Sequence, residues 1–268
     1  MRALSTTLLL GLCIGLAPSL HASVSFATGN GTVNGSSIVF NGGTFTATAT
    51  AFSTTGNSNT TLATATLGQY TYGLGVCNSN ENAGGCTTSG PPEHAVSNQT
   101  DTGVFPNVQN FDFVLLQFSV PLSSIQLTLS PFGTTEDMDA TYFTGNCTGT
   151  CTATNFRTNI IGKTDTTSVS TGLAAITGVS GVSTGSFTSP TTNISQSFTL
   201  NNAGPVNWVL IGASTAANYG GNGVADYFKL YSMDGSTGVP EPATFGMAGA
   251  ALAALGLLRR RKRLSANS

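Results

Sequence analysis

The sequence has very little charge. Only 7% of its 268 residues are Asp, Glu, Lys or Arg, against roughly 25% in an average soluble protein. Residues 23–238 hold just three basic residues against ten acidic ones, a balance of −7. A segment with so few cations cannot neutralise a phosphate backbone, which argues against nucleic-acid binding. Apolar residues make up 40% of the chain, so a buried core can form and disorder is not expected.

The N-terminus has the three parts of a secretory signal peptide. Arg2 supplies a positive charge, residues 8–17 (LLLGLCIGLA) form an apolar run, and a short polar stretch ends at the small residue Ala22. This order predicts export, with residues 1–22 removed by cleavage after Ala22. An uncleaved membrane anchor is the alternative.

The C-terminus has a second three-part pattern. A Pro-Glu-Pro sequence is followed by an apolar run, 243–258, and then by a basic cluster. Sixteen residues span about 24 Å as a helix, close to the roughly 30 Å of a bilayer's hydrocarbon core. The pattern predicts a single membrane-spanning helix with its basic tail in the cytoplasm. The residues concerned are Val239, Pro240, Glu241 and Pro242, then Arg259, Arg260, Arg261, Lys262 and Arg263.

Residues 23–238 have the pattern of an all-β domain. Runs rich in Thr, Val, Phe and Ile alternate along the chain and end at Gly, Asn, Pro or Ser, and no helical period extends beyond about two turns. Pro121 is expected to separate two strands, and 171–192 to form an edge strand pair or a long loop. Many short strands without helices predict a β-sandwich or jelly roll. The expected strands are 37–41, 43–53, 63–73, 111–120, 123–130, 138–144, 193–200, 207–214 and 226–233.

Beyond the signal peptide the chain has four cysteines, Cys77, Cys86, Cys147 and Cys151. An even number in an exported chain predicts disulfides, and four cysteines allow three connectivities. The favoured pairs are Cys77–Cys86 and Cys147–Cys151, each of which closes a short loop. A zinc site is the alternative, but the spacing lacks supporting histidines.

The densest acidic cluster surrounds Asp137 and Asp139. Alternate residues of a strand share a face, so these two carboxylates could converge on Ca²⁺, which prefers oxygen ligands. The alternative is a solvated turn that leads into a strand. No other cofactor is expected.

Few residues suit catalysis. His94 is the only histidine beyond the signal peptide. The stretch 181–185 (GVSTG) matches the G-x-S-x-G pattern around Ser183, but no α/β pattern surrounds it. The chain is therefore not expected to be an enzyme. Aromatic residues that stack on sugars from a face of the sandwich are a second possibility, and the alternative is that these residues lie in the core or are half-buried. The candidates are Tyr70, Tyr72, Tyr142, Phe143, Trp208, Tyr219, Tyr227 and Tyr231.

The tail, 239–268, resembles the PEP-CTERM sorting signal, because Pro-Glu-Pro, a short apolar helix and an Arg-rich end occur in that order. The resemblance implies recognition by an exosortase, an integral-membrane peptidase, and cleavage near Val239–Pro242.

The body is similar to the ectodomains of exosortase-dependent surface proteins. The resemblance implies a β-sandwich of unassigned biochemical function. The low charge, the Ser- and Thr-rich composition and the expected disulfides of an exported body favour a structural or adhesive role at the cell surface or in an exopolysaccharide matrix. A carbohydrate-binding module is the alternative, and a secreted hydrolase is less favoured. The resemblance to these ectodomains rests on the segments GLGVC (73–77), EHAV (93–96), FDFVLLQF (111–118), DMDATYF (137–143), WVLIGAS (208–214) and DYFKLYS (226–232).

Overall fold

The computed structural model describes residues 20–27, 32–33, 35–54, 62–77, 95–97, 111–131, 138–163, 165–189, 194–213, 226–237 and 252. Apart from residue 252, these all fall in one compact unit, Leu20–Gly238. Its elements are β1 (Leu20–Ser25), β2 (Thr32–Val33), β3 (Ser37–Asn41), β4 (Thr46–Thr54), β5 (Leu62–Thr64), β6 (Thr66–Tyr70), β7 (Gly73–Cys77), β8 (Val96–Ser97), β9 (Asp112–Pro131), β10 (Ala140–Cys147), α1 (Ala153–Ile160), α2 (Thr166–Ala174), β11 (Val179–Phe187), β12 (Gln196–Thr199), β13 (Val206–Ala213) and β14 (Tyr227–Thr237).

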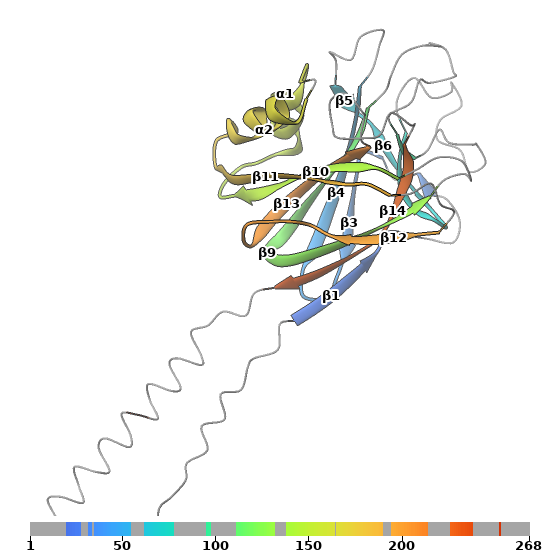
Figure 1. Ribbon diagram of the computed structural model, residues 1–268, viewed down its shortest axis with the longest axis horizontal. Coiled ribbons are helices and arrows are strands. Elements are labelled where there is room, and N and C mark those ends of the chain that lie inside the picture. The colour runs from blue at the N-terminus through green and yellow to red at the C-terminus, as the bar shows by residue number, and fades with distance from the viewer. Residues whose placement is uncertain are drawn as a thin grey trace, which may run out of the picture. The chain divides into compact units, whose positions relative to one another are not determined.

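The all-β fold class is confirmed, and the sheet of the described strands is open (Figure 1). The long strand β9 organises it. Before Pro121, β9 pairs with β4 and with most of β13, and one further pair with β13, Val206↔Leu122, follows Pro121. After Pro121 it pairs with β14 and β12.

Pro121 was expected to end a strand, and this is wrong. The strand continues through Pro121, but its register against β13 shifts between the pairs Trp208↔Gln117 and Val206↔Leu122. A proline cannot donate to the ladder, so it is tolerated where pairing is irregular. β9 thereby contributes to both parts of the sheet.

The main core lies between these two parts. Ala47, Ala49 and Ala51 of β4 are buried on one face, as the alternating pattern predicted. They belong to the same cluster as Leu74 of β7 and Phe228 of β14, which come from the other part of the sheet. Side chains of two facing parts of a sheet therefore share one core, which is the packing of a β-sandwich.

Two short helices cover the outer face of β13 and of the first half of β9. Phe156 of α1 and Leu173 of α2 are buried in a second cluster with Leu115 of β9 and Trp208 of β13. Phe156 meets the indole ring edge-on, with 5.0 Å between ring centroids. Neither helix was predicted, because each has only about two turns and is built largely of Thr, Ser and Asn.

Side-chain caps begin both helices. Thr152 Oγ1 accepts a hydrogen bond from Asn155 N at the start of α1. Asp165 and Ser168 form a reciprocal capping box at the start of α2. Such caps satisfy amide groups that have no partner within the helix. The segment 171–192, expected as an edge strand pair or a long loop, instead contains the end of α2 and then β11, which forms an edge of the sheet.

Candidate functional site

The predicted sorting signal begins where the folded body ends. β14 runs to Thr237, which pairs with Leu20 of β1 on one side and with Leu122 of β9 on the other. The two ends of the body are thus neighbours on adjacent strands. The sorting residues 239–242, the apolar run 243–258 and the basic cluster 259–263 lie outside the described residues, apart from residue 252 within the run. Among the described residues, no helix has the length and apolarity needed to cross a membrane.

The predicted cleavage point after Ala22 falls inside β1. Leu20, His21 and Ala22 pair with residues 235–237 of β14, and Ser23 with Asp234. Cleavage after Ala22 would remove the first half of this strand and leave residues 23–25 paired. The cleavage point itself stays a prediction.

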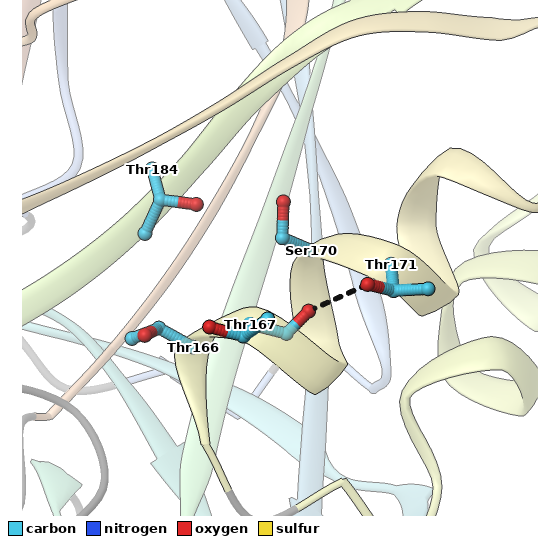
Figure 2. A pocket seen from close by; sticks show the side chains of 5 residues that line it. All are labelled: Thr166, Thr167, Ser170, Thr171 and Thr184. Atoms are coloured by element: carbon cyan, nitrogen blue, oxygen red, sulfur yellow. Dashed lines mark hydrogen bonds between the residues drawn. The ribbon is translucent and has the colours of Figure 1, made fainter.

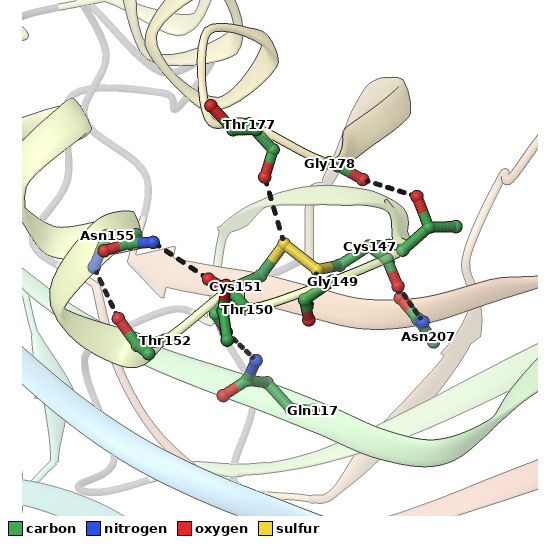
Figure 3. Close-up of a disulfide and its surroundings, with 11 residues drawn as sticks. Gln117, Cys147, Gly149, Thr150, Cys151, Thr152, Asn155, Thr177, Gly178 and Asn207 are labelled. Atoms are coloured by element: carbon green, nitrogen blue, oxygen red, sulfur yellow. Dashed lines mark hydrogen bonds between the residues drawn. A yellow bond between two sulfur atoms is a disulfide. The ribbon is translucent and has the colours of Figure 1, made fainter.

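A disulfide joins Cys147 to Cys151, as predicted, with 6.1 Å between their Cα atoms (Figure 3). Side chains of two neighbouring strands hold the loop from outside. Asn207 of β13 accepts from Cys147 N and donates to Cys147 O, at 2.8 and 2.9 Å. Gln117 of β9 donates to Cys151 O at 2.8 Å. The loop therefore links the end of β10 to α1 with little freedom.

Cys77, at the end of β7, is also disulfide-bonded. Its predicted partner, Cys86, lies outside the described residues.

The structure describes only one of the two predicted calcium ligands. Asp137 lies outside the described residues, whereas Asp139 is fully buried just before β10. Asp139 Oδ1 accepts from Ser189 N at 2.7 Å, and Asp139 N donates to Asp226 Oδ1 at 3.2 Å. The structure thus brings the buried Asp226 close to Asp139, and no sequence pattern signalled this pairing. Among the described residues, no group of three or more His, Cys, Asp or Glu could hold a metal ion.

A second buried carboxylate holds the short strand β8. Asp112 Oδ2 accepts from Ser97 N at 3.1 Å and from Ser97 Oγ at 3.0 Å. Asp112 also pairs in register with Ser53 of β4. This carboxylate therefore positions backbone within the body, and sequence analysis did not single it out.

Ser183 lies in the middle of β11, opposite Thr144 of β10. A nucleophile elbow needs a sharp turn between a strand and a helix, and this serine is in an extended strand instead. His94 lies outside the described residues. These two residues therefore supply no catalytic geometry that the structure describes.

An open pocket of about 260 Å³ lies between α2 and β11 (Figure 2). Thr171 Oγ1 donates to Thr167 O within it, at 2.9 Å. Hydroxyl groups line this pocket, and no lining residue titrates near neutral pH, so its chemistry is limited to hydrogen bonding. The lining residues are Thr166, Thr167, Ser170, Thr171 and Thr184.

The aromatic residues predicted to stack on sugars differ in how far their side chains are buried. Most of those that the structure describes belong to the core, whereas Tyr219 lies outside the described residues. Tyr70 is half-buried, and the Lys229 Nζ lies 3.8 Å from the centre of its ring. Tyr72 and Tyr231 are exposed. The buried ones are Tyr142, Phe143, Trp208 and Tyr227.

In this chain an all-β body is followed directly by the segment that the sequence predicts to be a sorting signal. Comparison with protein families makes this specific, because residues 238–262 match the PEP-CTERM protein-sorting motif. The match begins one residue after β14 ends, and it supports an exported protein that an exosortase processes. Comparison with curated proteins and with solved structures found no significant match.

Proposed function

We propose that this protein is a structural or adhesive component of the cell surface or of an exopolysaccharide matrix. The observation that carries the proposal is the PEP-CTERM motif at 238–262, which starts immediately after the last strand of the body. A motif in that position lets a peptidase release the whole domain without cutting into its core.

The route to the surface has two processing steps. The signal peptide, 1–22, directs export, and the apolar run 243–258 holds the precursor in the membrane with residues 259–263 in the cytoplasm. The exosortase then cuts near Val239–Pro242 and leaves the helix behind. The pairing of Ser23 with Asp234 supports this route, because both membrane-directed segments then join the body near the same end of the β1–β14 pair.

The composition of the body supports a non-enzymatic role. Its surface strands carry Ser and Thr in place of charge, and its buried carboxylates Asp112 and Asp139 accept hydrogen bonds from backbone amides. The Cys147–Cys151 bridge suits an oxidising compartment. In this proposal the body has no cofactor and no catalytic activity, and its partners are the exosortase and exopolysaccharide.

Intact mass and cell fractionation of the native protein test the proposal. The mature chain should begin near Ser23, end within 239–242, and occur at the outer surface or in the medium. Changing Pro240→Ala and Glu241→Ala together should retain the basic tail and keep the protein in the inner membrane. Pro205→Ala, which alters an exposed proline before β13, is the matched control and should be processed normally. A wild-type protein that retains residues 259–268 would refute exosortase processing.

A further inference from the structure

Two tyrosines are more exposed than the other aromatic residues that the structure describes. Among the described aromatic side chains, Tyr72, at 60% exposed, and Tyr231, at 39%, are the two most exposed to solvent. They lie about 160 residues apart in the chain, yet the fold brings their backbones close together. An exposed tyrosine offers a ligand both the apolar face of its ring and a hydroxyl group.

A strand irregularity displays Tyr231. In the register of β14 against β9, Leu230 pairs with Leu129 and Ser232 pairs with Thr128, so Tyr231 is an extra residue without a partner position in β9. This is the arrangement of a β-bulge, which redirects a side chain and is common next to functional sites. The backbone there is held in place, because Phe26 N donates to Tyr231 O at 2.9 Å.

A tight turn places Tyr72 beside this bulge. Tyr72 is the second residue of the two-residue turn between β6 and β7, and Gly73 follows it with a φ of +117°. A Cβ atom on Gly73 would collide with the Leu230 carbonyl oxygen and would lie 2.9 Å from Tyr231 Cα. Since consecutive Cα atoms are about 3.8 Å apart, the Cα atoms of the two tyrosines lie within about 8 Å of each other. Only glycine at position 73 permits this approach.

We infer that Tyr72 and Tyr231 form a binding platform for a neutral polysaccharide. The faces of aromatic rings are electron-rich, so they attract the weakly positive C–H faces of pyranose rings, while the phenol hydroxyls remain able to hydrogen-bond. Serine hydroxyls beside Tyr231 can meet sugar hydroxyls. Ser232 follows Tyr231 in the chain and pairs in register with Ser25 of β1.

Charge favours a neutral ligand over an anionic one. The described residues that directly flank the two rings in sequence or register are uncharged. Lys229, two residues before Tyr231, is only 2% exposed and lies against the ring of Tyr70. The balance of −7 over residues 23–238 would also repel a polyanion. This inference rests on the proposed function, because a matrix polysaccharide is available only to an exported body.

Binding should be measured with the processed protein purified from its host. The probes are four soluble neutral polysaccharides (an α-glucan, a β-glucan, a galactan and a mannan), with alginate as the anionic comparison. Tyr72→Ala and Tyr231→Ala should each weaken binding of the recognised neutral polymer about five- to tenfold. Val39→Ala removes an exposed apolar side chain on β3, so it is the matched control and should leave the affinity unchanged. Thermal unfolding of each variant checks that the fold is retained.

The possible outcomes separate this inference from the proposed function. A double variant of Tyr72 and Tyr231 that binds like the wild type would refute the site. Binding to alginate alone would refute the ligand class. A protein that is exported and processed but binds none of the neutral polymers would refute the inference and leave the sorting route intact. A protein that keeps its C-terminal tail would refute the sorting route, and the tyrosine variants would still report on binding.

Discussion

The Cys147–Cys151 bridge gives the sharpest prediction for stability. Its removal by the double change Cys147→Ala and Cys151→Ala frees a closed loop of five residues in the unfolded chain. The loop-entropy relation gives about 2 kcal/mol for a loop of this length. The loss of stability should not exceed this entropic value, because Asn207 and Gln117 still hydrogen-bond to the backbone of the loop in the variant. For a body of this size, such a loss should lower Tm by about 4–8 °C.

Denaturant unfolding of the oxidised protein measures this difference. The variant should unfold at a lower denaturant midpoint with an unchanged m-value, because the surface exposed on unfolding is nearly the same. Thr150→Ala, at an exposed position in the same loop, keeps the bridge and should stay within about 0.5 kcal/mol of the wild type. A double variant as stable as the wild type would refute the entropic argument. A loss above about 4 kcal/mol would show instead that the bridge supports the packing of α1.

Two further predictions concern the helical side of the body. Gly145→Ala should cost about 1–3 kcal/mol, because the added Cβ would lie only 2.9 Å from Trp208 Cε2; calorimetry should show no such loss for Gly204→Ala, where a Cβ meets open space. The amide of Ser168 donates a hydrogen bond to Asp165 and thereby lowers the pKa of that carboxyl below its ordinary 3.8. The charged carboxylate therefore stabilises α2 above pH 3.8, and this stabilisation is lost as the pH falls through the lowered pKa of the folded state. The stability advantage of the wild type over Asp165→Asn, followed by thermal unfolding from about pH 6 down to about pH 2, should therefore shrink with acid, and an advantage independent of pH would contradict this assignment.

Periodicity located most strands, since a strand buried on one face must alternate apolar and polar residues. The strand predicted at 37–41 has those bounds in the structure, and the alternating alanines of β4 face the core. The two helices were not predicted, because short Thr- and Ser-rich segments have a weak preference for the helical conformation. Burial of Phe156 and Leu173 in the folded body stabilises these helices instead.

Parts of the candidate site were predictable to different degrees. The spacing of Cys147 and Cys151 sufficed for their pairing, because a five-residue loop brings its ends together at small entropic cost. The neighbourhood of Asp139 and Asp226 was not predictable, since the two residues are 87 positions apart and only the sheet brings them together.

The sequence by itself determined the sorting motif of this protein, because a peptidase recognises a short linear pattern that needs no folded neighbours. The motif at 238–262 can therefore be recognised without a structure, from the Pro-Glu-Pro sequence, the apolar run and the basic residues that follow the run. Only the tertiary structure decided which aromatic residues face solvent. Tyr72 and Tyr231 look like the other tyrosines in the sequence, but a bulge in β14 and the close approach of Gly73 bring their backbones near each other.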